Sequence, residues 1–145
     1  MTAPDTPQTQ TPVLPALADF PFPTALVVTG APAPDGGALY ESGDVDEIFP
    51  FASVTKPIVA WSALVAVDRG LLDLDAPAGA PAPDGATIGH LLSHSSGIAT
   101  DSDERLATPG TRRIYSNRGI EILGERLQEA TGTPLETWVE TTVLE

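Results

Sequence analysis

The sequence has 145 residues, 41% of them hydrophobic, which is enough apolar content for one ordinary folded domain. It contains 20 Asp and Glu but only 7 Lys and Arg, for a formal net charge of −13. This balance argues against a nucleic-acid partner and against docking on anionic lipid, because both require a basic surface. There is no cysteine, so disulfides, thiolate nucleophiles and cysteine-type zinc sites are excluded.

Residues 1–23 are rich in proline and threonine and predict a flexible or extended lead-in. They lack the positive n-region and the apolar stretch of a signal peptide. No run approaches the ~20 apolar residues of a membrane span. We therefore expect a cytoplasmic protein with no membrane partner, whose folded part is residues 24–145.

The first predicted element is a β-hairpin. Thr24 to Gly30 is rich in β-forming residues, residues 31–37 (APAPDGG) indicate a turn, and Gly37 to Ser42 can return as a second strand. Because an isolated hairpin is only marginally stable, further strands are expected to complete its sheet.

A long apolar stretch from Pro57 to Asp68 predicts the next element, a helix. Proline suits its first turn and Gly70 suits the position just after its end. Apolar side chains cover nearly every side, which is typical of a helix buried on several sides. Trp61 is therefore expected in the core.

The remaining elements are predicted to be helical. After a proline-rich loop at 76–86, Thr87 begins a short helix through His94, and residues 99–114 form a mostly polar connection. The next helix is expected to be amphipathic, with Asn117 as its cap and Gly132 as its end; its apolar side includes Ile120, Leu123 and Leu127.

A last helix is predicted over residues 134–143. The sequence Thr133-Pro134-Leu135-Glu136 has the pattern of a capping box with proline at the first helical position. Trp138 in this helix is expected to lie in the core.

Lys56 is the only lysine in the chain, and it follows Ser53 by three positions. Residues at i and i+3 of a helix share a face, so the lysine can reach the serine hydroxyl. A lysine acts as a base only when neutral, which requires a pKa well below ~10.4. Burial and the positive end of the helix dipole both lower the pKa of a lysine. Arginine cannot take this role, because it is not deprotonated in proteins. The alternative is that Ser53 only caps the helix, since Ser-x-x-Lys is a common pattern.

Tyr115 and Asn117 form a second candidate pair at the start of the amphipathic helix. A phenol next to a cationic lysine has a lowered pKa and can relay protons. The amide of Asn117 can donate to and accept from a substrate amide or carbonyl. The alternative is that Tyr115 is an interfacial aromatic residue and Asn117 only a helix cap.

Two other groups of residues were considered as sites. His90 and His94 are four apart and would share a helix face, but a metal site needs a third ligand and no HExxH is present. Asp101, Asp103 and Glu104 lack the glycine and distal glutamate of an EF-hand, which favours a solvated turn. No metal or cofactor is therefore predicted.

Four segments, in this order, carry a resemblance to a known family: FASVTK at 51–56, LLDLDAP at 71–77, TIGHLLSHSSGI at 87–98 and YSN at 115–117. They are similar to segments of the serine β-lactamase-like hydrolases, which include class C β-lactamases, D-Ala-D-Ala peptidases and related esterases. The resemblance extends from about residue 24 to the C-terminus.

The resemblance implies an α/β fold of the α+β type, the β-lactamase/transpeptidase-like fold. An antiparallel sheet flanked by helices meets a mainly helical lobe, with the active site between them. It further implies that Ser53 is the acylated nucleophile and Lys56 its base or base partner. Tyr115 would be the proton relay, and Asn117 would orient the substrate and contact Lys56.

The sequence also departs from the family pattern. The third motif of the family, Lys-Thr-Gly or His-x-Gly on a late strand, is absent, as are the later strands. We therefore expect the N-terminal part of a serine hydrolase, with little turnover alone and with possible self-association or complementation by a C-terminal fragment. An ester or amide is the expected small-molecule substrate, an esterase being favoured over a peptidase or β-lactamase. The alternative is a non-catalytic binding module, or pseudoenzyme, of the same fold.

Overall fold

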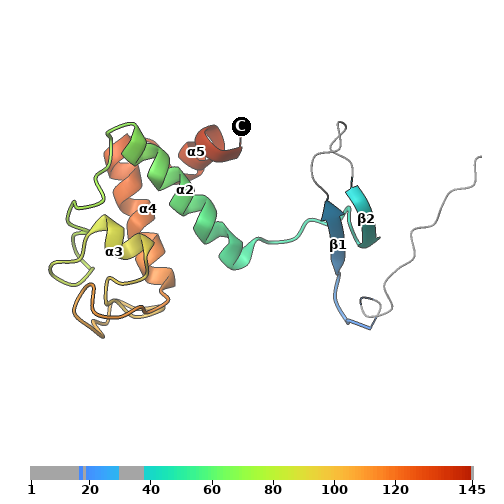
Figure 1. The fold of residues 1–145 in the computed structure, drawn as a ribbon, viewed down its shortest axis with the longest axis horizontal. Helices are drawn as coiled ribbons and strands as arrows, with labels where there is room; N and C mark the ends of the chain where they lie inside the picture. Colours follow the sequence, from blue (N-terminus) through green and yellow to red (C-terminus); the bar gives the residue numbers. More distant parts are fainter. Residues whose placement is uncertain (1–16, 18, 30–37, 145) are drawn as a thin grey trace, which may run out of the picture. The chain divides into compact units, whose positions relative to one another are not determined.

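The structure, a computed structural model, describes residue 17 and residues 19–29 and 38–144 (Figure 1). These residues divide into two units, one ending at Pro50 and one beginning at Phe51. The predicted turn at 31–37 and most of the predicted lead-in lie outside the described residues. The proposed boundary between residues 23 and 24 stays a prediction.

The first unit contains a β-hairpin, as predicted. Strand β1 (Ala25–Thr29) pairs antiparallel with β2 (Ala38–Gly43), and the register is irregular between Val28 and Thr29. Val27 and Val28, which point to opposite faces of the strand, are both exposed. Most of the described side chains of β1 are therefore exposed, while Ser42 in β2 is buried.

Helix α2 (Thr55–Asp68) follows a 3₁₀ turn, Ala52–Val54, so it begins two residues earlier than predicted. Gly70 follows its end with a φ of +70°, as predicted. The expected core position of Trp61 is wrong for the described chain, since its side chain is 65% exposed. Small side chains cover the inner face, and the buried residues of α2 are Val59, Ser62, Ala63 and Ala66.

Three further helices pack with α2 around one core: α3 (Ile88–Leu92), α4 (Asn117–Thr131) and α5 (Leu135–Val139). A π-helical turn, Glu140–Leu144, follows α5. Figure 1 shows α2 and α4 packed together, with α3 beside α4. The largest fully buried apolar side chains come from α3, α4 and the intervening loop: Ile88, Leu91, Ile98, Ile122, Leu123 and Leu127.

The cap of α4 differs from the prediction. Ser116 is the N-cap, with extended backbone (φ −136°, ψ 118°), and its hydroxyl accepts a hydrogen bond from the Gly119 N–H at 2.8 Å. Asn117 is instead the first helical residue. The predicted end of α4 at Gly132 is confirmed by its left-handed backbone.

The capping box predicted at Thr133 is also wrong. The Leu135 N–H is bound by Oε1 of Gln128, at 3.0 Å, while the Thr133 hydroxyl donates to the Thr131 carbonyl. The core position of Trp138 is confirmed: it is 7% exposed, and its Nε1–H donates to the Ser62 carbonyl at 3.0 Å.

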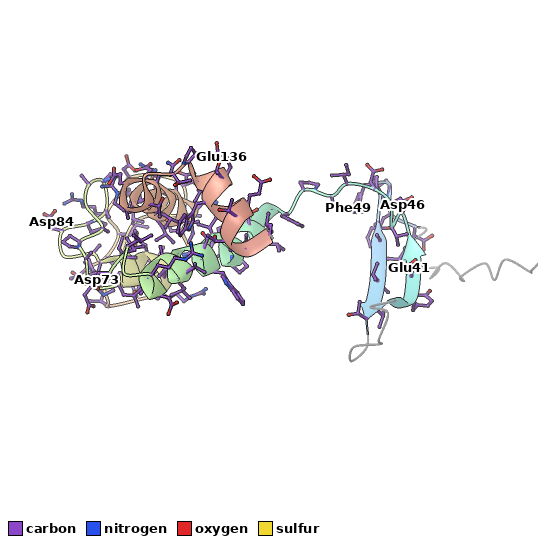
Figure 2. The ribbon with its side chains drawn as sticks, turned by 90° about the horizontal axis from the view of Figure 1, so that it is seen from above. Glu41, Asp46, Phe49, Asp73, Asp84 and Glu136 are labelled. Carbon is purple, nitrogen blue, oxygen red and sulfur yellow. The ribbon has the colours of Figure 1, made fainter. Side chains whose placement is uncertain are left out.

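Acidic side chains lie on the surface of the helical unit. Figure 2 labels three of them, Asp73, Asp84 and Glu136, and all three are exposed. Among the described helices, none combines the length and the apolar character needed to cross a bilayer.

Candidate active site

Three of the predicted site residues meet at the hydroxyl of Ser53. Lys56 donates a hydrogen bond from Nζ to Ser53 Oγ at 2.9 Å. Tyr115, 62 positions away in the chain, donates from its phenol to the same oxygen at 2.8 Å. The Lys56 ammonium also lies 4.9 Å from the centre of the Tyr115 ring. The serine oxygen thus accepts hydrogen bonds from both the lysine and the phenol.

The backbone before Ser53 is strained. Ala52 has a φ of +45°, in the left-handed region that non-glycine residues rarely adopt. Only one other described non-glycine residue, His94, has a positive φ, and it lies at the same site. Strained residues of this kind cluster at functional sites, where the surrounding structure compensates for their cost.

The electrostatics of Tyr115 agree with the sequence analysis. The interaction with Lys56 is the largest cause that lowers the pKa of the Tyr115 phenol, and the hydrogen bond with Ser53 is the next. The predicted lowering of this pKa by a neighbouring lysine is therefore confirmed in direction. The burial expected around Lys56 is only partial, because its side chain is half-buried and Ser53 is exposed.

A pocket of about 330 Å³ opens over these residues. Its polar groups are the serine, lysine and tyrosine just described, together with one histidine, and its apolar groups come from α2, α3 and α4. The lining residues are Ser53, Lys56, Pro57, Ala60, Leu92, His94, Tyr115 and Ile120. A small acyl group beside Ser53 would therefore contact mainly apolar surface.

Asn117, the fourth predicted site residue, is placed differently. Its Nδ2 donates to Oδ1 of Asp101 at 2.5 Å. The predicted contact with Lys56 is absent from the hydrogen bonds of the described residues, and Asn117 does not line the pocket. The physical reason is the charge-assisted hydrogen bond to the Asp101 carboxylate, which holds the Asn117 side chain against the loop that contains Asp101.

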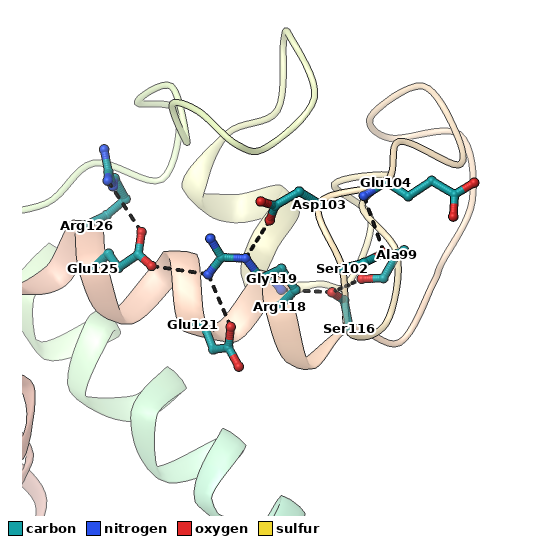
Figure 3. A network of polar contacts seen from close by, with 10 residues as sticks. All are labelled: Ala99, Ser102, Asp103, Glu104, Ser116, Arg118, Gly119, Glu121, Glu125 and Arg126. Atoms are coloured by element: carbon teal, nitrogen blue, oxygen red, sulfur yellow. Dashed lines mark hydrogen bonds and ion pairs between the residues drawn. The ribbon is translucent and has the colours of Figure 1, made fainter.

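Several hydrogen bonds tie the loop at 99–104 to the start of α4 (Figure 3). Ser116 Oγ donates to the Ala99 carbonyl at 2.6 Å, and the Arg118 N–H donates to the Thr100 carbonyl at 3.0 Å. Arg118 Nε also donates to Asp103 Oδ1 at 2.6 Å. The acidic cluster predicted as a solvated turn is exposed, but two of its carboxylates, Asp101 and Asp103, are bonded to α4.

Arg118 extends this network along α4. Its Nη1 lies 3.1 Å from Oε2 of Glu121 and 3.2 Å from Oε1 of Glu125 (Figure 3). The hydrogen bond to Asp103, followed by the bond to Glu125, raises the pKa of the guanidinium above its usual value. Tyr115 thus precedes a helix whose first turn is fixed to a neighbouring loop.

The two histidines do not share a helix face, because α3 ends at Leu92, before His94. His90 caps α3: its Nδ1 accepts from the Thr87 N–H at 3.1 Å. The described residues contain no group of three or more His, Cys, Asp or Glu placed to hold a metal ion.

His94 is the site residue that the sequence reasoning missed. Its ring centre lies 4.7 Å from that of Tyr115, and it lines the pocket. The available signal was its position in TIGHLLSHSSGI, one of the four segments that carry the family resemblance. The family resemblance indicated only that this segment packs near the site, and it gave no role to His94.

The hairpin, the helices around α2 and the Ser53 site place the chain in the β-lactamase/transpeptidase-like fold class. A model of the Beta-lactamase family matches residues 26–145, and the chain belongs to this family. It is 44% identical to a β-lactamase from Mycobacterium bovis, with a TM-score of 0.72 over 86% of this chain and 43% of that one. The predicted family and fold class are confirmed.

Two further relatives extend the comparison. Esterase EstB of Burkholderia gladioli is 35% identical over 142 residues, covering 68% of this chain and 36% of the esterase. The octameric penicillin-binding protein homologue of Pyrococcus abyssi shares the fold, at 23% identity and a TM-score of 0.68 over 83% of this chain and 37% of that one. The chain therefore spans less than half the length of each of these relatives.

Proposed function

We propose that this chain supplies the nucleophile and the proton-transfer residues of a serine hydrolase that forms an acyl-enzyme on an ester. The observation that carries the proposal is the pair of hydrogen bonds to Ser53 Oγ, from Lys56 at 2.9 Å and from Tyr115 at 2.8 Å. A serine hydroxyl needs a base within hydrogen-bond reach to become a nucleophile, and both partners meet that distance.

In the first half-reaction, the Lys56–Tyr115 pair reacts in the form that has already lost one proton to solvent. Ser53 Oγ attacks the substrate carbonyl carbon, and the proton of Ser53 passes to the vacant position on this pair. We assign the proton to the pair and not to one member, because both groups lie within hydrogen-bond distance of Ser53 Oγ. The carbonyl π electrons move to oxygen to give a tetrahedral oxyanion. Its collapse breaks the bond to the leaving alkoxide, which takes the proton back from the pair, with Tyr115 as the donor.

In the second half-reaction, water replaces the alcohol. The pair accepts a proton from water as its oxygen attacks the acyl carbon. Collapse of this second intermediate breaks the bond to Ser53 Oγ, which regains the proton, and the free acid leaves. The lowered pKa of Tyr115 supports this role, because a general base is most effective when its pKa lies near the working pH.

An ester is favoured over an amide for two reasons. An alkoxide is a better leaving group than an amide anion, so cleavage of an ester depends less on protonation of the leaving group than cleavage of an amide does. Esterase EstB, at 35% identity, supports the same choice. The M. bovis relative is named a β-lactamase, so a β-lactam amide is the substrate to compare directly in an assay.

Turnover by this chain alone is expected to be low. The late-strand motif that supplies the second oxyanion donor is not in the sequence, and one such donor contributes about 10²–10³ in rate. A complementing C-terminal fragment, or association between copies, would be the route to full activity.

Asn117 favours a second candidate, a binding module without turnover. Because its amide is bonded to Asp101 at 2.5 Å, it would have to leave that carboxylate to orient a substrate. If it stays there, the substrate-binding role of Asn117 fails and the pseudoenzyme alternative gains support.

The test is covalent labelling with a fluorophosphonate probe, which reacts with activated serines without needing a second half-reaction. We expect one label on the chain, located at Ser53 by peptide mass spectrometry and lost in Ser53→Ala. Ser102→Ala, at an exposed serine outside the pocket, is the matched control and should label normally. An unlabelled chain, both alone and with a C-terminal fragment of family length, would contradict the hydrolase and favour the binding module.

A further inference from the structure

His94 is bonded to the peptide groups on both sides of Tyr115. The Ile114 N–H donates to the His94 carbonyl at 2.7 Å. The Ser116 N–H donates to Nδ1 of the His94 ring at 3.2 Å. One residue therefore holds the backbone immediately before and immediately after the tyrosine.

The two rings are also in contact. Their centres are 4.7 Å apart at an angle of 37°, a distance at which aromatic rings attract each other. The Tyr115 side chain is otherwise exposed, yet its phenol lies 2.8 Å from Ser53 Oγ. An exposed phenol needs such contacts to stay at hydrogen-bond distance from its partner, since free rotation about its side-chain bonds would carry it away.

The backbone at this position restricts the choice of residue. His94 has a φ of +57°, which glycine adopts freely and asparagine tolerates better than most residues. A residue chosen only for this turn would need no ring. The contacts of the ring with Tyr115 and Ser116 account for the histidine.

We propose that His94 is a positioning residue that holds Tyr115 against Ser53, and that it acts through the lone pair of an unprotonated Nδ1. The proposal rests on the proposed function, because it assumes that Tyr115 transfers protons to and from Ser53. His94 touches no reacting atom in this scheme. Its ring accepts the Ser116 N–H and packs on the phenol, which fixes the direction of Tyr115.

The bond from Ser116 sets the protonation state of the ring. Nδ1 can accept an N–H only while it carries no proton, so the neutral ring holds its hydrogen on Nε2. Burial is the first cause that lowers the pKa of His94, followed by the positive charges of Arg113 and Lys56. These two cations and the Tyr115 phenol are the titratable groups that face the ring; α3 and α4 contribute apolar Leu92 and Ile120 to the same pocket.

Two substitutions distinguish the contribution of the His94 side chain from that of its left-handed backbone. His94→Gly accepts the left-handed φ but removes the acceptor and the ring contact. His94→Asn tolerates the same φ, and its Oδ1 can take the place of Nδ1 as acceptor for the Ser116 N–H. We expect the second-order rate of probe labelling to fall about 10- to 100-fold in His94→Gly, because small misplacements of a reacting group have effects of this size. His94→Asn keeps the acceptor but loses the ring contact, so its rate should fall by a smaller factor, about threefold.

His90→Asn is the matched control, the same chemical change at the histidine that caps α3. Its labelling rate should be unchanged, since His90 contacts Thr87 and does not line the pocket. Circular dichroism and thermal unfolding identify any variant that has lost its fold.

Two NMR measurements on the unlabelled chain test the inference without any reaction. A scalar coupling across the hydrogen bond should connect the Ser116 amide nitrogen with Nδ1 of His94, and at pH 7.5 the ring should be the Nε2–H tautomer. The chain has two tyrosines, so Tyr115→Phe assigns the ¹³Cζ signal of Tyr115. The pKa read from this signal should rise in His94→Gly, because the phenol moves away from Lys56, and should stay close to the original value in His94→Asn.

Three results would overturn the proposal: wild-type labelling in folded His94→Gly, equal losses in His94→Gly and His94→Asn, or a proton on Nδ1 at pH 7.5. If the original chain labels neither alone nor with a C-terminal fragment of family length, the proposed function fails. The coupling and the Tyr115 titrations then still decide whether His94 positions the phenol.

Discussion

The two segments that meet at Ser53 are built in opposite ways. The nucleophile segment, residues 51–60, has no side-chain hydrogen bond at the cap of its 3₁₀ turn or of α2, and it exposes Phe51 and Val54. The relay segment, residues 94–118, is held by long-range hydrogen bonds on both sides of Tyr115. Ser116 and Ile98 in the relay segment are fully or almost fully buried.

This difference separates two ways of placing a reactive group. Ser53 and Lys56 are brought together by helix geometry alone, since three positions along a helix suffice. Tyr115 reaches them only because hydrogen bonds to His94 and at the capped start of α4 hold the backbone on both sides of it. The nucleophile segment should therefore be sensitive to the chemistry of its side chains, and the relay segment to its hydrogen bonds.

The largest expected effect is chemical and falls on the nucleophile segment. In Lys56→Arg the positive charge is kept, but the guanidinium cannot give up its proton. We expect probe labelling at Ser53 to slow by about 10²–10⁴-fold, the usual contribution of a general base. The free energy of unfolding should change by less than about 0.5 kcal/mol, as for other partly exposed side chains.

The comparison of Lys56→Arg with Lys56→Met tests the reason for this loss. If proton transfer is what matters, both variants should be equally slow. A Lys56→Arg chain that labels at near-normal rate would instead assign Lys56 a purely electrostatic role and would leave Tyr115 as the base.

The next effect is structural and falls on the relay segment. Ser116→Ala removes the N-cap of α4 and leaves both the Gly119 N–H and the Ala99 carbonyl without their partner. We expect a loss of about 2–3 kcal/mol in the free energy of unfolding, measured in urea, because these groups are buried. Ser102→Ala is the exposed control. Labelling at Ser53 should also slow by about tenfold as Tyr115 loses its fixed position.

A Ser116→Ala chain that is destabilised, but labels normally under conditions where it is folded, would contradict the difference between the two segments. The hydrogen bonds of the relay segment would then serve only the fold, and the contact between Tyr115 and Ser53 would be formed by the pocket itself.

The sequence predicted what depends on local spacing. The hairpin, the end of α2 at Gly70 and the pairing of Ser53 with Lys56 all follow from neighbouring residues, and the structure has them. The core position of Trp138 was predicted correctly from its apolar character, but the same reasoning failed for Trp61, which is 65% exposed. Apolar composition says that a side chain favours burial; it does not say which element covers it.

The sequence could not predict partners chosen by competition between polar groups. Asn117 and Ser116 are both good N-cap residues, and the Gln128 amide can also accept from a free backbone N–H. The tertiary structure decides which of these side chains serves which helix end. His94 shows the same limit, because its contacts depend on a left-handed turn after α3. Nothing in the spacing of the two histidines indicates that turn.

A smaller effect should appear in the pH dependence of stability. The pKa of His94 is lowered in the folded chain, so at a pH between its folded and unfolded values the unfolded state binds more protons. The stabilisation is therefore complete above the unfolded value of about 6.5 and is lost as the pH falls through the folded value. One proton limits the slope to about 1.4 kcal/mol per pH unit. In urea unfolding between pH 7.5 and 5, the original chain should lose more stability than His94→Asn as the pH falls, by at most this slope, and parallel curves would contradict the prediction.

The smallest expected effect concerns the surface part of the relay segment, the ion pairs of Arg118. The side chains of Arg118 and Asp103 are 21% and 58% exposed, so water and salt screen their 2.6 Å contact. A double-mutant cycle with Arg118→Ala and Asp103→Ala should give a coupling of about 0.5–1 kcal/mol that falls further in 1 M NaCl. Labelling at Ser53 should change by less than twofold, since the backbone bond from Arg118 to the Thr100 carbonyl survives both substitutions. A coupling above about 2 kcal/mol, or a labelling loss like that of Ser116→Ala, would mean that surface charges rather than buried hydrogen bonds position Tyr115.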